Sequence, residues 1–271
     1  MVPVRDLGKR SLLGVLVDVL DYEAAVGRII DASLEPRPYA ATALAVHGVM
    51  TGSSDKFHRF RLNNLDMVTP DGQPVKWALN LLHRARLRDR VYGPSLMMRI
   101  CSAAERENLP IYLYGSTKET LERLATNLQS RFSALPIAGT SPSIFGTTTK
   151  QEQELIAESI RASGARIVFV GLGCPRQEIF AYEYRDLLGI PVVAVGAAFD
   201  YHAGIRREPA LWVQRMGLQW LHRLVQEPGR LWKRYLILNT SYVFLIALQA
   251  LGIKRRNPLE AEAPREELLP A

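Results

Sequence analysis

The sequence predicts an α/β fold with a mostly parallel sheet that helices cover on both faces, followed by a basic helical C-terminal appendage. Three observations lead to this prediction. Short apolar segments alternate with amphipathic ones along residues 1–204, residues 167–178 read as a buried strand running through a glycine turn into a helix, and basic residues gather after position 205. We therefore expect an α/β core at 1–204, a basic amphipathic appendage at 205–256 and a disordered tail at 257–271.

Composition excludes several classes of protein. The 271 residues are 48% hydrophobic, so the chain can bury a large core and is neither fibrous nor disordered as a whole. Cys101 and Cys174 are far apart and form no CxxC pair, which argues against a disulfide framework and a structural zinc site. The sequence has no DxD-like acidic pair of the kind that binds a divalent ion. We therefore expect no metal and no cofactor.

The first elements follow from local pattern. Residues 12–19 form an apolar run. We interpret it as a first strand rather than part of a signal peptide, because Asp18 interrupts it and no cleavage signal follows. A helix is expected at 22–32 with Asp21 as its cap, and a second strand at 39–52 that reaches a loop at His47 and Gly48. A basic helix at 56–64 and a short strand at 65–68 lead into the turn 69–74, TPDGQP.

The remaining core continues the alternation. Helices are expected at 75–83, from 91–95 through 107, at 118–132 and at 151–163; strands are expected at 111–114, 136–139, 167–170 and 191–196. This is a Rossmann-like arrangement, in which ligands bind beyond the carboxyl ends of the strands. The loops at those ends are therefore where we look for a site.

Two of these loops carry residues suited to chemistry. Asp71 lies between a proline and a glycine just past a buried strand, where a partly desolvated carboxylate could take a proton from a hydroxyl group. The same residue could simply cap a turn. In GLGCPRQE (171–178), the glycines allow a ligand close to the backbone, and the following helix start favours an anion such as a diphosphate.

The appendage concentrates positive charge and apolar surface. Residues 205–256 hold ten Lys or Arg against Glu208 and Glu227, a net charge of +8. The whole chain carries +7, so the rest of the chain sums to about −1. Residues 235–253 are strongly apolar with basic clusters on both sides. We expect a monotopic helix in the interface of an anionic membrane rather than a membrane span. The alternative is an ordinary buried helix with a solvated basic face.

Six motifs occur in a specific order: TPDGQP (69–74), RVYGP (90–94), YLYGS (112–116), GLGCPRQE (171–178), AVGAAFDYHAG (194–204) and RLVQEPGRLWKRY (223–235). Over residues 12–250 the chain resembles the WecG/TagA/CpsF group, glycosyltransferase family 26. The resemblance implies metal-independent, inverting transfer of a sugar from a UDP-sugar to a polyprenyl-diphosphate-linked sugar. It also implies a peripheral location at the cytoplasmic face of the bacterial inner membrane, in the synthesis of surface polysaccharide.

The resemblance assigns roles residue by residue. It makes Asp71 the catalytic base. The donor-binding residues would be His47, Gly72, Gln73, Tyr92, Gly93, Gly115, Gly171, Gly173, Pro175, Arg176, Gln177 and Asp200. The acceptor diphosphate and the membrane would contact Arg223, Arg230, Lys233 and Arg234. Ala43 and Ala45 depart from the family, since many members have polar residues there, so the donor sugar stays open among N-acetylmannosamine, uronate and glucose types.

Two other functions are compatible with the residues. A nicotinamide-dependent oxidoreductase would use the same fold, but GLGCPR lacks the third glycine of GxGxxG. A non-catalytic membrane or nucleic-acid binding module would use the basic appendage and leave Asp71 idle. Under the transferase reading the partners are the UDP-sugar, the lipid-linked acceptor and the membrane surface, with no nucleic acid, and self-association could cover the apolar appendage.

Overall fold

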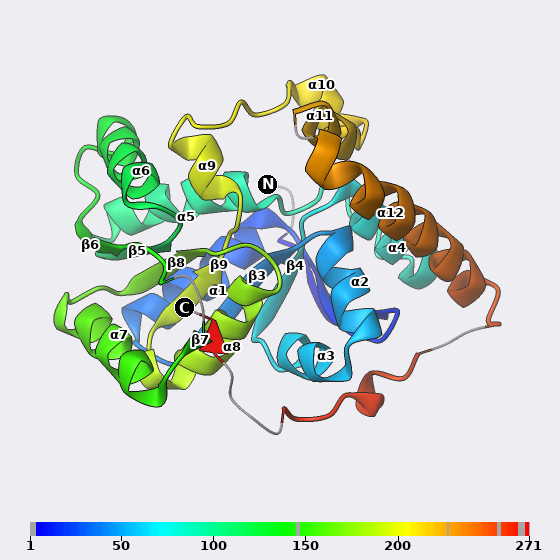
Figure 1. Cartoon of the computed structure of the whole chain (residues 1–271), viewed down its shortest axis with the longest axis horizontal. Coiled ribbons are helices and arrows are strands. Elements are labelled where there is room, and N and C mark those ends of the chain that lie inside the picture. The colour runs from blue at the N-terminus through cyan, green and yellow to red at the C-terminus, as the bar shows by residue number, and fades with distance from the viewer. Residues whose placement is uncertain (1–3, 145–146, 227, 254–255, 265–268, 271) are drawn as a thin grey trace.

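The computed structural model describes the chain except at residues 1–3, 145–146, 227, 254–255, 265–268 and 271. A six-stranded sheet forms its centre, and every neighbouring pair of strands is parallel (Figure 1). In sheet order the strands are β4 (Met67–Pro70), β3 (Tyr39–Leu44), β9 (Pro191–Ala194), β8 (Ile167–Gly171), β5 (Ile111–Gly115) and β6 (Ile137–Ser141). The predicted α/β fold with a mostly parallel sheet is confirmed.

Helices cover both faces of this sheet because successive strand residues are apolar, so that both faces are apolar. In β8, Val168 and Val170 belong to one buried cluster, while Ile167 and Phe169 belong to the other. The first cluster packs against α2 (Val46–Ser54), α3 (Lys56–Asn63), α4 (Gln73–His83), α7 (Lys150–Ala162) and α8 (Arg176–Leu188). The second packs against α1 (Tyr22–Leu34), α5 (Gly93–Arg106), α6 (Lys118–Arg131) and α9 (Ala198–His202). Two separate cores result, one on each side of the sheet.

The first predicted strand is a hairpin outside the main sheet. Strand β1 (Asp6–Leu12) pairs antiparallel with β2 (Val15–Leu20), and the turn between them places Leu13 at φ 53° and Gly14 at φ 88°. The glycine tolerates this left-handed backbone, so the apolar run at 12–19 breaks in two. Asp18 of β2 is buried and accepts a hydrogen bond from the Val68 N–H of edge strand β4 at 2.8 Å.

The predicted second strand at 39–52 is also wrong in its second half. Strand β3 ends at Leu44 and helix α2 begins at Val46, so His47 and Gly48 lie in a helix rather than a loop. Gly48 allows close packing, because a Cβ atom there would lie 2.3 Å from Leu44 Cδ1. Strand β4 extends through Pro70, and α4 begins at Gln73. Only two residues of the predicted turn 69–74, Asp71 and Gly72, therefore lie between the strand and the helix.

The appendage consists of α10 (Leu211–Arg215), α11 (Gln219–Gln226) and α12 (Pro228–Ala250), and α12 runs beside α4 and α2 (Figure 1). Tyr242 and Ile246 of α12 are buried in the core, and the Tyr242 hydroxyl donates to Pro74 O at 3.3 Å. Gln249, near the end of α12, binds the β1–β2 turn through Leu13 N–H at 2.9 Å. Among the described residues, no helix has both the length and the apolar character needed to cross a membrane.

Part of the segment expected to be a disordered tail lies against α3. A 3-10 helix, η1 (Pro258–Glu260), follows Arg256, and Glu262 pairs with Lys56 at 2.6 Å. Further on, the short strand β10 (Leu269–Pro270) pairs with β7 (Thr147–Thr148). The division into core, appendage and tail stays a prediction.

Candidate active site

Asp71 stands at the carboxyl edge of the sheet, directly after β4. Its backbone N–H donates to Leu44 O at 3.2 Å, so the residue is level with the end of neighbouring strand β3. The Gly93 N–H, in the first turn of α5, donates to Asp71 Oδ1 at 3.3 Å. The residue is half-buried, and its carboxylate accepts this hydrogen bond from a backbone group. This is the arrangement that a general base needs, since a fixed carboxylate keeps its reach toward a hydroxyl group.

Gly93 lies close to the ends of the neighbouring strands β3 and β9. A Cβ atom at this position would lie 3.1 Å from Ala43 Cβ on β3 and 3.2 Å from Val195 O at the end of β9. A Cβ atom here would require its neighbours to shift by a few tenths of an ångström. Glycine therefore suits the close approach of α5, from which Gly93 donates its hydrogen bond to Asp71.

Arg90 is a site residue that the motif RVYGP contains and that sequence reasoning did not select. Arg90 is 4% exposed, and its guanidinium donates through Nη1 to Asp71 O at 3.1 Å. The same group donates to the side-chain oxygen of Gln219 on α11 and, at 3.3 Å, to that of Gln214 on α10. It also stacks 4.2 Å from the centre of the Tyr92 ring. Arg90 thus connects the Asp71 loop to the appendage.

The glycine turn after β8 is shaped by close contacts. Gly115 and Gly171 are partners at the ends of β5 and β8, and a Cβ atom on Gly115 would lie 2.9 Å from Gly171 O. A Cβ atom on Gly171 would lie 2.5 Å from the ring of Phe199, the neighbour of Asp200 on α9. The predicted loops after β5, β8 and β9 therefore do converge.

Gln177 supports this turn from beneath. Its Oε1 accepts from Gly173 N–H at 3.2 Å, and its Nε2 donates to Glu178 Oε1 at 2.9 Å. Gln177 is buried, and Gly196 after β9 must be small because a Cβ atom there would lie 3.0 Å from Gln177 Oε1. The amide group therefore holds the backbone of the turn, and a role of Gln177 in donor binding stays a prediction.

The other predicted donor residues lie around this edge. His47 is half-buried in the first turn of α2, Gly72 precedes α4, and Gln73 is buried at the start of α4. Arg176 and Pro175 stand at the start of α8. Asp200 pairs with Arg206 at 2.9 Å.

Tyr92 lies between Arg90 and the core. Burial raises the pKa of the Tyr92 hydroxyl, and the charges of Asp71 and Glu208 raise it further. The phenol is therefore neutral at physiological pH, so it can donate a hydrogen bond without adding negative charge beside the Asp71 carboxylate.

The predicted acceptor residues fall on two helices. Arg223 is on α11, whereas Arg230, Lys233 and Arg234 are on α12. The structure describes only the backbone of these four residues, and their side chains lie outside the described part. Residue 227, between α11 and α12, lies outside the described residues, so the alignment of these four residues on one helix face stays a prediction.

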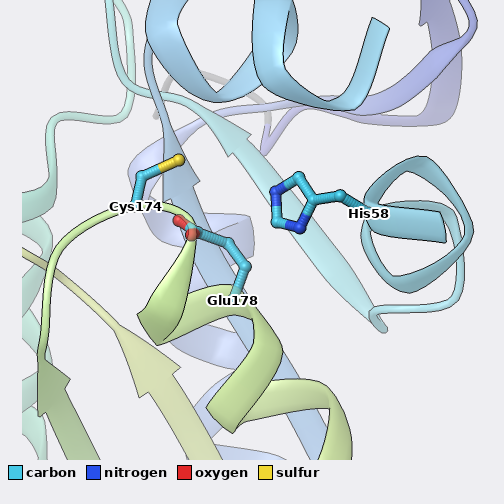
Figure 2. Close-up of side chains that lie close together, drawn as sticks. All are labelled: His58, Cys174 and Glu178. Atoms are coloured by element: carbon cyan, nitrogen blue, oxygen red, sulfur yellow. The ribbon is translucent and has the colours of Figure 1, made fainter. Parts of the chain in front are cut away.

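Two further features lie outside this edge. An open hollow of about 670 Å³ between α2, α3 and residues 256–260 contains no predicted site residue. Figure 2 shows a second cluster, in which His58 of α3 faces Cys174 and Glu178.

Comparison with known proteins decides the family. The model of the Glycosyl transferase WecG/TagA/CpsF family matches residues 10–256. The chain belongs to this family. Within the WecG/TagA/CpsF family, the N-acetylglucosaminyldiphosphoundecaprenol N-acetyl-beta-D-mannosaminyltransferase of Bacillus subtilis strain 168 is 32% identical over 177 residues. The protein with the same name from Bacillus spizizenii strain W23 is 31% identical over 177 residues. Each match covers 65% of this chain and 66% of the relative.

Proposed function

We propose that the protein transfers a sugar, with inversion, from a UDP-sugar to a polyprenyl-diphosphate-linked sugar during synthesis of a bacterial surface polysaccharide. One observation carries the proposal beyond family membership. The Asp71 carboxylate is fixed by the Gly93 N–H at the edge where the loops after β3, β4, β8 and β9 converge. A half-buried base and a glycine turn at the same edge of the sheet match the needs of an acceptor hydroxyl and a nucleoside diphosphate.

The chemistry follows from this placement. Asp71 takes the proton of the acceptor hydroxyl while that oxygen bonds to the anomeric carbon of the donor. The bond from the anomeric carbon to the phosphate oxygen breaks on the opposite face, and UDP leaves with its electron pair. Arg176 and the dipole of α8 stand at the glycine turn, where they would favour the departing diphosphate without a metal ion.

The donor sugar is proposed from the relatives. Both are named as transferases of N-acetylmannosamine to N-acetylglucosaminyldiphosphoundecaprenol. We therefore place UDP-N-acetylmannosamine first, ahead of uronate and glucose donors. Ala43 is buried against Gly93 and Ala45 is exposed, so two side chains that are polar in many family members contribute no hydrogen bonds here.

The appendage supports a peripheral membrane location at the cytoplasmic face. Its outer surface exposes large apolar side chains along all three helices: Trp212, Met216, Trp220, Leu221, Val225, Trp232, Ile237, Val243 and Phe244. Apolar surface of this extent marks a site of contact with lipid or protein. With a net charge of +8 in the same segment, we propose an anionic lipid surface that carries the acceptor.

The deciding experiment measures UDP release from a panel of UDP-sugars by vesicle-bound protein, with and without a polyprenyl-diphosphate-sugar acceptor. Wild type is compared with Asp71→Asn and with the control Asp31→Asn, an exposed residue on α1. We expect acceptor-dependent release that falls by about 10²–10⁴-fold only in Asp71→Asn. Equal release by Asp71→Asn and wild type would remove Asp71 from the mechanism. Binding of NAD(H) without binding of UDP would instead support an oxidoreductase.

A further inference from the structure

Three side chains with metal-binding atoms meet beneath the glycine turn. His58 comes from α3, Cys174 from the turn itself and Glu178 from the first turn of α8 (Figure 2). Their ligand atoms all lie within 4.8 Å of one another. The cluster uses none of the groups assigned above to sugar transfer, so it stands or falls independently of the proposed function.

His58 is the member that points to a ligand. It is 2% exposed, and neither Nδ1 nor Nε2 has a hydrogen-bond partner. Buried imidazole nitrogens almost always have a hydrogen-bond partner or a metal ion. The two ring nitrogens of His58 have no hydrogen-bond partner, which points to a ligand at this position. Burial lowers the pKa of His58 to about 4; Asp55 opposes this shift, and Arg61 adds to it. The ring is therefore neutral near pH 7, the form that binds metals.

Glu178 complements this ring. The residue is almost fully buried, and its Oε1 accepts hydrogen bonds from Thr42 Oγ1 at 3.0 Å and Gln177 Nε2 at 2.9 Å. Its Oε2 has no hydrogen-bond partner. Burial raises the pKa of this carboxyl, against the influence of its hydrogen bonds. Two donors on one oxygen orient the carboxylate and leave the other oxygen available to a cation, as outer partners do at known metal sites.

We propose that His58, Cys174 and Glu178 bind a zinc-type divalent cation through one nitrogen, one sulfur and one oxygen atom. Three protein ligands of these kinds with a fourth position left open are typical of zinc. Ligand atoms about 2.0–2.3 Å from a metal lie roughly 3.3–3.8 Å apart, so the cluster has to contract by about 1 Å. Cys174 can provide this movement because it lies half-buried in a turn next to an exposed glycine.

The location gives the site a consequence for the fold. A bound cation would fasten α3 to the turn between Gly173 and Pro175 and to the start of α8. Binding would displace the proton of the thiol and any proton on Glu178, so the affinity should rise with pH. Because the native cluster binds the metal, the apparent stability of the whole chain should rise with metal concentration.

The test uses the full chain without a histidine tag, reduced and treated with a chelator. Co²⁺ is titrated in while absorbance is recorded, and Zn²⁺ is then added as competitor. We expect a thiolate-to-cobalt charge-transfer band that saturates at a single ion per chain and disappears with Zn²⁺. His58→Gln and Cys174→Ser should weaken binding by about a hundredfold. Cys101→Ala, which removes the other, fully buried thiol, should keep the band.

A second readout needs no variant. Zn²⁺ should protect Cys174 of wild-type protein from alkylation, measured by mass spectrometry of its peptide, while Mg²⁺ at the same concentration should not. The proposal is overturned if wild type shows no charge-transfer band, if the band survives Cys174→Ser, or if Zn²⁺ leaves alkylation of Cys174 unchanged.

Discussion

Arg90 is a buried cation whose acceptors come from three separate segments of the chain. Arg90→Lys keeps the charge but loses the planar fork that reaches the Asp71 carbonyl and both glutamines. Hydrogen bonds from charged donors contribute about 1.5–3 kcal/mol each, so we expect kcat to fall about tenfold or more.

Steady-state kinetics of UDP release would check this expectation. Arg99→Lys is the matched control, since Arg99 also stacks on a tyrosine, Tyr22, but is exposed. A change in KM without a change in kcat, or an equal fall in kcat in both variants, would contradict the role given to Arg90.

Gly171 has no room for a side chain. In Gly171→Ala the new methyl group would lie 2.5 Å from the Phe199 ring, and overpacking of this kind costs about 1–3 kcal/mol. The double variant with Phe199→Leu should recover part of that free energy of unfolding. Urea denaturation of both single variants and the double variant measures the coupling. Gly27→Ala on α1, where a Cβ atom meets nothing, serves as control and should not destabilise the chain.

For single residues, the sequence predicts where a residue lies in the fold better than it predicts which distant residues it contacts. Asp71 and Gly93 were placed at the same edge because each follows a recognisable strand or opens a recognisable helix. Arg90 and His58 were missed because their significance depends on Gln219 and Cys174, which only the tertiary fold brings near. No local pattern carries that information.

Helix α9 is fastened to the start of α5 by His202, whose ring N–H donates to Pro94 O at 2.9 Å. Burial lowers the pKa of His202, despite the opposing effects of this hydrogen bond and of Glu208, and Arg131 lowers it further. The unfolded chain therefore binds more protons below its histidine pKa of 6.5. Stability from neutral His202 is complete above that value and is lost as pH falls through the folded pKa.

We therefore expect the free energy of unfolding to drop on acidification from about pH 7.5 to about pH 5.5, and to drop less in His202→Gln. Urea denaturation at both pH values measures the difference. His83→Gln, on a helix end far along the chain from α9, provides the comparison. An equal drop in wild type and His202→Gln would show that another group carries the pH dependence.

Most core elements were predicted within a few residues because strand alternation and helix caps are local signals, as with Asp21. The two failures, at 12–19 and 39–52, occur where glycines break an apolar run. Gly14 turns the chain back on itself, while Gly48 permits a helix to pack against a strand. The residue type is the same in both, and only packing distinguishes the roles.

For the molecule as a whole, the apolar outer surface of α10–α12 predicts vesicle binding. Trp212 is 63% exposed, and transferring such a side chain from water contributes about 1.5–3 kcal/mol. Trp212→Ser should therefore weaken binding to vesicles of anionic phospholipid by about tenfold or more. Sedimentation with vesicles measures this. Leu155→Ser on α7 matches it in exposure, at 64%, and should bind as wild type does. Equal binding by all three would assign the apolar surface to another partner.

Strand order is the whole-molecule property that the sequence did not provide. Alternation shows that the sheet is parallel and covered on both faces, but β9 inserts between β3 and β8 although it comes last among the six strands. The order depends on contacts between distant segments, and it is this order that brings Val195 and Gly196 beside Gly93 and Gln177.

The buried Asp18 also disfavours edge-to-edge association between copies of this chain at β4. Its Oδ2 accepts the Val68 N–H that an incoming strand would otherwise use, and its Oδ1 is paired with Arg28 at 3.1 Å. A foreign strand adding to β4 would have to displace the hairpin and leave a charged group in an apolar setting. Edge-to-edge aggregation is thereby discouraged on this side of the sheet, and β6 at the opposite edge is where such growth would begin.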